Sequence, residues 1–251
     1  MEILEERRAS RSAPKVIALL ALNDRVDMRA FVTSFAEAAG VEDPARVANA
    51  MAEAPDRPCT FEVPRHRHRL SFLRARADAP LAALETVKAA DGLLVVAPCV
   101  APPSTLDAME HNGAMDEGTK GNEGKDFPSP AEPSGEVAET LRVARAQGFP
   151  PAVAVALVGL DRVHAKKKAS TRNTVVTTVL KALQISADRP KFVPCDSRAE
   201  LADLARVLCE QRSTHPPWRS KRAYVLAERA SLVAETHSAA FGPKPAIEPV
   251  A

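Results

Sequence analysis

Short aliphatic runs alternate with segments of helical periodicity along most of the chain. The runs at 15–22, 92–97 and 152–157 are built almost entirely from Ala, Val, Leu and Ile, which is typical of strands buried on both faces. Two further strands at 59–63 and 69–75 are predicted to form a hairpin. A short last strand is predicted at 191–194, and helices are predicted at 27–39, 80–90, 136–147, 171–183 and 198–211.

This alternation predicts a three-layer α/β fold. Strands and helices of these lengths favour a mostly parallel sheet with helices on both faces, to which the hairpin adds one antiparallel edge. Such sheets place their ligand sites at the carboxyl ends of the strands. The turns that follow the strands are therefore where binding or catalytic residues are expected.

One domain is predicted over residues 15–230, after an N-terminal arm at 1–14 and before a segment at 231–251 that would begin a connection to a following domain. Within the domain, the stretch 101–135 holds five of the ten glycines and five of the 21 prolines, with little apolar periodicity. We predict that this stretch is a flexible insertion.

Composition excludes several classes of protein. The chain of 251 residues is 45% hydrophobic and 4% aromatic, so its core is expected to be aliphatic. No apolar run approaches the roughly 18 residues of a membrane span, and the charged start predicts no secretory signal. The four cysteines lack the CxxC spacing of a zinc site and are expected to be reduced core residues: Cys59, Cys99, Cys195 and Cys209.

The turn after the first predicted strand, at 22–27, lacks the features of a phosphate-binding loop. It contains no glycine or lysine, and Asp24 and Asp27 place two carboxylates where a phosphate would lie. The two aspartates could hold a metal ion. The favoured alternative is an aspartate cap on the helix that follows.

Two further turns are also degenerate as nucleotide sites. Asp78 has no glycine after it and is interpreted as a helix cap, while Asp161 keeps only the carboxylate of a guanine-recognition turn, because Val158 and Gly159 replace the polar pair. The segment 195–197, Cys-Asp-Ser, is interpreted as a cap on the last helix. The pattern resembles a GTPase domain from which the nucleotide chemistry has been removed.

Other catalytic constellations are weak. His66 and His68 flank Arg67 in what is interpreted as an exposed basic strand; their spacing could start a metal site, but no cysteine or paired carboxylate lies nearby in sequence to complete it. There is no Gly-x-Ser-x-Gly elbow, and Cys195 and Cys209 have no adjacent histidine. We therefore predict no catalytic residue, cofactor or metal.

Basic residues gather in three clusters although the net charge is only +2. Such groupings suit contact with a phosphate backbone, and the alternative is solvated surface. The first cluster comprises Arg65, Arg67, Arg69, Arg74 and Arg76; the second Lys166, Lys167, Lys168 and Arg172; the third Arg212, Arg219, Lys221 and Arg222 around the only tryptophan, Trp218.

The third cluster carries a family resemblance. The segment 218–228, with Trp218-Arg219, basic residues and then Tyr224 before a hydrophobic run, resembles the segment that closes the GTPase-like domain in the Bms/Tsr family of ribosome-assembly factors. The stretches 88–91 (Lys-Ala-Ala-Asp) and 146–150 (Ala-Gln-Gly-Phe-Pro) are similar to two junctions of the same family. The resemblance covers roughly residues 15–228 and is strongest from 136 onward.

The turn at 22–27 lacks a phosphate loop, and in this it resembles the Tsr branch of that family, which has lost the loop. The resemblance implies a catalytically inactive GTPase-like scaffold that binds the pre-40S particle and its rRNA during 18S rRNA maturation, with ribosomal proteins and other assembly factors as further partners. It also implies residence in the nucleolus and nucleus, with onward passage to the cytoplasm on pre-40S particles. No membrane, small-molecule substrate or cofactor is expected. The candidate RNA-binding residues are Arg65, Arg67, Arg69, Lys166, Lys167, Lys168, Arg172, Arg219, Lys221 and Arg222.

Two alternatives remain open. An active GTPase of the Bms type, with an unusual nucleotide site, is supported only by the architecture and Asp161. A flavodoxin-like or other small-molecule enzyme would share the sheet, but the strand ends supply no converging set of polar groups.

Overall fold

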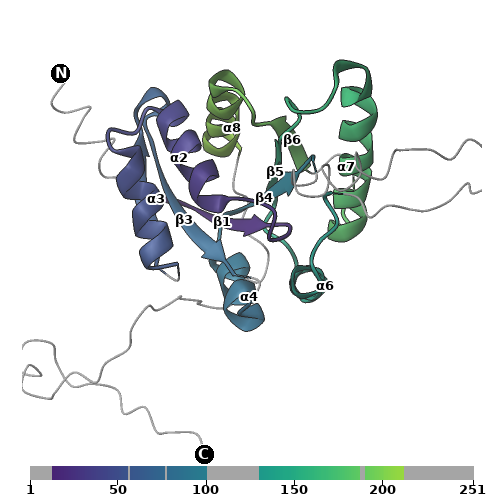
Figure 1. The fold of residues 1–251 in the computed structure, drawn as a ribbon. Coiled ribbons are helices and arrows are strands. Elements are labelled where there is room, and N and C mark those ends of the chain that lie inside the picture. The colour runs from purple at the N-terminus through teal and green to yellow at the C-terminus, as the bar shows by residue number, and fades with distance from the viewer. Residues whose placement is uncertain (1–12, 56, 77, 101–129, 187–189, 212–251) are drawn as a thin grey trace, which may run out of the picture.

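The computed structural model describes residues 13–55, 57–76, 78–100, 130–186 and 190–211, and these form three layers around one sheet (Figure 1). The sheet has six strands in the order β2-β3-β1-β4-β5-β6. Only β2 runs against its neighbour; the other four pairings are parallel. The strands are β1 Lys15–Ala21, β2 Cys59–Val63, β3 His68–Ala75, β4 Gly92–Pro98, β5 Ala152–Val158 and β6 Pro190–Pro194.

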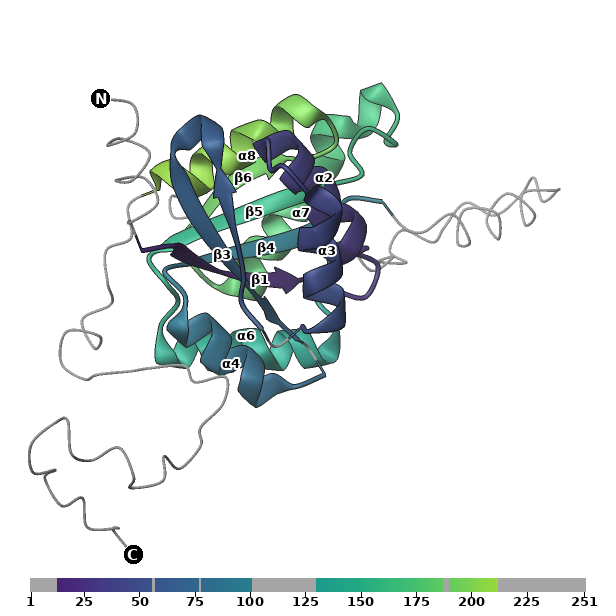
Figure 2. The same cartoon turned by 90° about the vertical axis from the view of Figure 1, so that its left-hand side faces the viewer.

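The predicted fold class is confirmed. A mostly parallel sheet, with one antiparallel strand added through the hairpin, lies between two helical layers (Figure 2). The hairpin strand β2 forms one outer edge of the sheet, antiparallel to β3. β4 lies near the middle of the sheet and is buried along its whole length, as a strand with helices on both faces must be.

Each face of the sheet has its own core. On one face, α2 (Met28–Ala39), α3 (Pro44–Glu53) and α8 (Arg198–Glu210) contribute buried residues to a single cluster with the inner side chains of the strands. On the other face, α4 (Pro80–Ala89), α6 (Gly135–Gln147) and α7 (Lys168–Leu183) do the same. The strands separate these two clusters because successive side chains point to opposite faces.

Four phenylalanines form the densest part of the first core. The ring of Phe35 lies 5.3 Å from that of Phe72 and 6.3 Å from that of Phe61, and Phe61 and Phe72 meet edge to face at 5.0 Å. Phe31 stacks on Phe35 at 6.4 Å. Aromatic pairs at these separations add to the burial energy, so this cluster fixes the β2–β3 hairpin against α2.

The amino ends of the strands are tied to each other and to α8. The ammonium of Lys15 donates to the carbonyl oxygen of Leu208 at 2.6 Å and also to that of Gln211, which satisfies carbonyls that the end of a helix leaves without partners. The Asp91 carboxylate, before β4, accepts the N–H of Val16 at 2.9 Å. Both residues therefore position the starts of β1 and β4.

One helix is missing from the sequence prediction. α3 begins at Pro44 after Asp43, whose carboxylate accepts the N–H of Arg46 at 2.9 Å. It buries Val47 and Met51 at helical spacing. An Asp-Pro start is a recognised helix signal, but an apolar face of only three buried residues makes the periodicity weak.

The predicted basic strand around Arg67 is wrong in part. His66 ends a short 3₁₀ helix, η1 (Pro64–His66), and Arg67 forms the turn with a φ of 51°. β3 begins only at His68. His66 and His68 therefore do not lie on one face of a strand, and the i, i+2 argument for a metal pair does not apply.

The end of the predicted insertion is also packed. Ala131 is fully buried, Ser134 caps α6, and Gly135 begins that helix. The remaining predicted segments 1–12, 101–129 and 212–251 lie outside the described residues. Within the described part of the chain, no helix is both long and apolar enough to cross a membrane.

Truncation of Phe35 tests the aromatic cluster. We expect Phe35→Ala to lower the free energy of unfolding by about 3–5 kcal/mol, because a fully buried ring leaves a cavity among three other rings. Urea denaturation measures this loss. The control is Leu81→Ala, whose side chain is 78% exposed and should change stability by less than about 0.5 kcal/mol. Equal effects of the two variants would contradict the assignment of the core.

Candidate functional site

The turns that follow the parallel strands meet at the carboxyl edge of the sheet. The pairings of β1, β3, β4, β5 and β6 are parallel, so the segments after these strands lie at one edge. The predicted positions Asp24, Asp27, Asp78 and Asp161 all follow strands of this set. This edge is therefore the candidate functional site.

The turn after β1 is bonded to another part of the same chain. The side-chain amide of Asn23, which is only 7% exposed, donates to the carbonyl oxygens of Pro130 at 2.9 Å and Glu132 at 3.0 Å. The N–H of Ser134 in turn donates to the carbonyl of Leu22 at 3.2 Å. The segment 130–134 therefore lies along the turn at which a phosphate loop would be expected.

Asp27 is a helix cap, as predicted. Its carboxylate accepts the N–H of Ala30 at 2.9 Å, so the start of α2 is already bonded to an anionic group. Asp24 is exposed. Among the described residues no three His, Cys, Asp or Glu side chains lie together as metal ligands, and neither Asp24 with Asp27 nor His66 with His68 gains a third ligand from them.

Asp78 does not cap α4, contrary to the prediction. It forms an ion pair with Arg76, whose Nε lies 2.9 Å from the carboxylate, and the cap position belongs to Ala79, which makes no side-chain cap. The hydrogen bond from Arg76 lowers the pKa of Asp78. The side chain of Arg76 is 32% exposed and that of Asp78 is 62% exposed, so solvent weakens the pair and it adds little stability.

Asp196 joins the turns after β5 and β6. Its carboxylate accepts the N–H of Gly159 at 2.5 Å and the N–H of Asp161 at 3.1 Å. Burial raises the pKa of Asp196 more than these two hydrogen bonds lower it. The backbone of the predicted guanine-recognition turn is therefore bound by a carboxylate of the protein itself.

The cap predicted at 195–197 is confirmed for Ser197 alone. Ser197 and Glu200 form a capping box at the start of α8. The sequence prediction missed that Asp196 bonds the turn after β5. A polar residue close to the end of β6, the neighbour of β5, was a possible signal. Asp161 itself is exposed, and among the described residues its carboxylate accepts only the neighbouring N–H of Arg162, at 2.9 Å.

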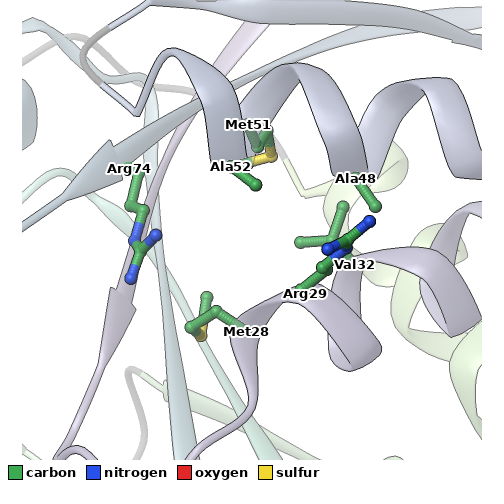
Figure 3. Close-up of a pocket in the computed structure, with 7 residues that line it drawn as sticks. All are labelled: Met28, Arg29, Val32, Ala48, Met51, Ala52 and Arg74. Atoms are coloured by element: carbon green, nitrogen blue, oxygen red, sulfur yellow. The ribbon is translucent and has the colours of Figure 1, made fainter.

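A small cavity lies beside the carboxyl edge, between the start of α2, the end of α3 and β3 (Figure 3). Met28, Val32 and Met51 give it an apolar lining, and Arg29 and Arg74 stand at its sides. Its volume is about 20 Å³, enough for one water molecule and far too small for a nucleotide. Arg74 of the first basic cluster therefore lines this small cavity.

The second basic cluster begins at the carboxyl edge. Lys166 and Lys167 lie in the 3₁₀ helix η2 (Ala165–Lys167), Lys168 begins α7 and Arg172 follows one turn later. All four side chains are exposed, and none forms an ion pair with another described residue. We name these four residues the lysine cluster.

Lys168 is close enough to α8 to influence a carboxylate there. Burial raises the pKa of Glu200, but hydrogen bonds from Ser197 and Asp196, together with the positive charge of Lys168, outweigh it and lower the pKa overall. Lys168 is therefore partly neutralised by Glu200, which leaves Lys166, Lys167 and Arg172 as the freer charges of the cluster.

Two arginines of the first basic cluster lie at the edge of the sheet opposite to the lysine cluster. Arg65 and Arg67 lie in the turn before β3, at the amino edge of the parallel strands, and both are exposed. Arg69 lies in β3, partly buried and opposite Glu62. The remaining predicted residues, Arg212, Trp218, Arg219, Lys221, Arg222 and Tyr224, lie outside the described residues.

The fold and this edge define the described part of the chain as a three-layer α/β domain in which the turns after β1 and β5 are bonded to other residues of the chain. No protein-family model matches the sequence, and a search of curated proteins finds no match. Among solved structures, the chain is similar to a bacterial selenocysteine-specific elongation factor, EF-Sec, at 14% identity and a TM-score of 0.43. The match covers 78% of this chain and 28% of the elongation factor, and at this level it carries no information on function.

Removal of the Asp196 carboxylate tests the joined turns. We expect Asp196→Ala to lower the free energy of unfolding by about 1–3 kcal/mol, because the N–H groups of Gly159 and Asp161 lose their acceptor. Amide hydrogen exchange of these two residues should also accelerate. Asp203→Ala removes an exposed carboxylate from α8 and should cost no more than about 0.5 kcal/mol. Unchanged exchange at Gly159 would show that Asp196 does not hold the turn.

Proposed function

We propose that the chain is a non-enzymatic ribosome-assembly factor, a GTPase-like scaffold that binds the pre-40S particle through rRNA phosphates during 18S rRNA maturation. The observation that carries this proposal is the composition of the carboxyl edge. There the nucleotide turns are bonded to Asn23, Asp27 and Asp196, while the lysine cluster at the same edge has no anionic partner in an ion pair among the described residues.

The turns argue against nucleotide turnover. A phosphate site at the start of α2 would need free N–H groups and a cation, and Asp27 supplies an anion instead. A guanine site at the turn after β5 would need polar side chains directed at a base, whereas Asp196 bonds the backbone of that turn. An active GTPase of the Bms type is therefore the second candidate.

The lysine cluster supports contact with RNA. Its residues occupy the start of α7, whose first turn contains no acidic residue and whose cap position makes no side-chain hydrogen bond. Positive charge at a helix start opposes the helix dipole and costs some stability. An anionic ligand would relieve that cost, and a phosphate backbone supplies many such charges.

The ribosomal part of the proposal rests on the family resemblance, whose strongest segment, 218–228, lies outside the described residues. On that ground the proposed partners are pre-40S rRNA, ribosomal proteins and other assembly factors. The proposed location is the nucleolus and nucleus, with onward passage to the cytoplasm on pre-40S particles.

Titration with a fluorescent guanine nucleotide at millimolar magnesium tests whether the carboxyl edge binds a nucleotide. We expect no saturable binding, because the first turn offers carboxylates and no lysine to a triphosphate. A known GTPase measured in parallel shows that the assay works. Tight binding of GTP would favour the active-GTPase alternative and overturn the scaffold proposal.

Charge reversal of the lysine cluster tests RNA binding. We expect Lys166→Glu, Lys167→Glu and Lys168→Glu together to weaken binding of unrelated RNA duplexes by at least about tenfold at moderate salt. The slope of log affinity against log salt should fall by about one for each phosphate that the protein no longer neutralises. The tagged full-length variant should also co-sediment less with small-subunit precursors, with mature subunits as the reference.

Two features make this reversal selective. Glutamate at the start of α7 is favourable to the helix dipole, which offsets the lost attraction between Lys168 and Glu200, so the free energy of unfolding should change little. A matched control reverses three exposed basic residues elsewhere, Arg46, Arg145 and Lys191, with the same change in net charge. If the cluster variant binds RNA as well as this control does, the lysine cluster is only solvated surface.

A further inference from the structure

A second group of basic residues lies at the turn of the β2–β3 hairpin. The five residues Pro64–His68, which we name the hairpin tip, contain two arginines and two histidines and no carboxylate. Arg65, Arg67 and His68 are exposed. Among the described residues, neither Arg65 nor Arg67 forms an ion pair.

The backbone at Arg67 adopts a conformation that is uncommon for arginine. Its φ of 51° lies in the left-handed region, which Gly, Asn and Asp adopt more readily than other residues. An arginine there carries a backbone cost that a glycine would avoid. Such an outlier motivates a functional hypothesis, and here it places an exposed cation in the turn.

A cavity of about 200 Å³ lies beside the hairpin tip. Alanines of α2 and α8 line it, Arg65 and His66 form one side, and Asp203 and Arg206 form the other. Its volume is about ten times that of the small cavity near Arg74. The tip therefore stands next to a hollow and is not packed tightly against α8.

The hairpin tip and the lysine cluster lie at opposite edges of the sheet. The tip precedes β3 and the lysine cluster follows β5, and both strands run in the same direction as β1. β3 has 8 residues, which at about 3.3 Å each separates the two edges by roughly 25 Å. Figure 2 shows the tip of the hairpin and the start of α7 on either side of α8.

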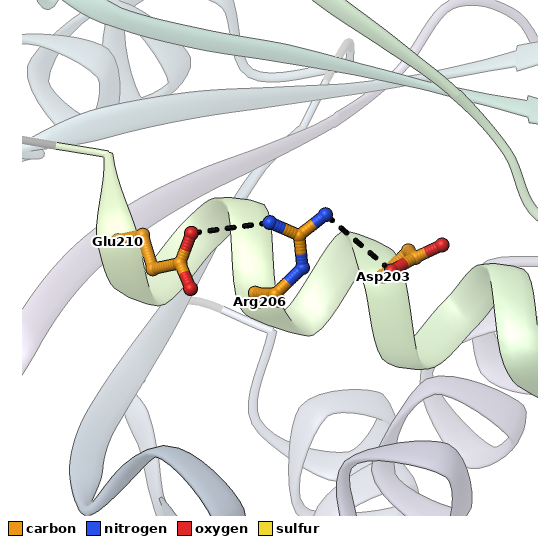
Figure 4. A network of polar contacts seen from close by, with 3 residues as sticks. All are labelled: Asp203, Arg206 and Glu210. Carbon is orange, nitrogen blue, oxygen red and sulfur yellow. Dashed lines mark hydrogen bonds and ion pairs between the residues drawn. The ribbon is translucent and has the colours of Figure 1, made fainter.

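The surface of α8 next to the hairpin tip carries carboxylates, and Asp203 lines the cavity there. Arg206 bonds Asp203 at 3.5 Å and Glu210 at 3.2 Å (Figure 4). One arginine is therefore matched by two acidic groups along this helix, and both carboxylates are exposed. A phosphate backbone that followed α8 from one basic group to the other would meet like charge.

We propose that the domain binds two separate segments of RNA at the same time, one at the lysine cluster and one at the hairpin tip. This inference rests on the proposed function and adds to it a bridging geometry. The ligand at each position is the phosphate backbone, because each position offers exposed cations. Two linked segments would then bind with an effective concentration that raises the overall affinity.

A capture assay with the full chain tests this proposal. One short RNA duplex is immobilised, the protein is added, and a second duplex with a fluorescent label is supplied. We expect the wild type to retain the second duplex on the first. Arg65→Glu with Arg67→Glu, and separately the triple lysine reversal, should each keep binding to one duplex and lose capture of the second. A double control, Arg46→Glu with Arg145→Glu, should behave as the wild type.

The outcomes separate this proposal from the proposed function. Loss of all RNA binding by the wild type would overturn both. If the wild type binds one duplex but does not capture a second, only the two-RNA proposal is overturned. Capture by a mixture of the two variants would also overturn it, because two protein molecules would then connect the duplexes. If Arg65→Glu with Arg67→Glu weakens association with small-subunit precursors but not capture, the hairpin tip contacts protein and the two-RNA proposal is wrong.

Discussion

Every buried polar group at the carboxyl edge of the sheet needs a partner, and this requirement organises the candidate site. A parallel sheet brings the turns after β1, β5 and β6 to one edge, with N–H and C=O groups that cannot be left without hydrogen bonds. In a nucleotide-binding sheet, phosphate and base supply some of these bonds. Here Asn23 and Asp196 supply them from within the chain. These bonds fix the turns after β1 and β5, so the connection that leads to the lysine cluster starts from a fixed turn.

Much of the fold follows from local features of the sequence, and most of the site does not. The strands at β4 and β5 are apolar runs, and helices such as α2 have apolar spacing and an aspartate cap, so neighbouring residues determine them. Asn23 and Asp196 differ because their partners are distant in sequence. Asn23 bonds Pro130, which lies 107 residues away, and Asp196 bonds Gly159, which lies 37 residues away. No local pattern encodes such a pairing. Asp78 shows the reverse case, because a neighbour two residues away, Arg76, takes the carboxylate that the pattern assigned to a cap.

The charges of the described surface fall into groups with different uses. Arg142 and Arg206 are matched by carboxylates of their own helices, and such exposed pairs mainly keep the surface neutral. Lys15 is half-buried and bonds the end of α8, and burial lowers its pKa although Cys209 and Asp91 act in the opposite direction. The lysine cluster and the hairpin tip belong to neither group. A net charge of +2 therefore conceals two concentrated positive regions, because acidic residues elsewhere balance the total.

The stability of the sheet and the chemistry of its edges depend on different residues. The two cores are built mainly from the interiors of strands and helices, and few turn residues such as Leu22 and Cys195 take part in them. Substitution in the turns therefore leaves most buried area untouched, provided that the freed polar groups find new partners. Asn23 and Asp196 meet that condition. Once it is met, the sheet is a rigid body whose two edges can acquire basic residues independently, which is the arrangement that a bridging scaffold requires.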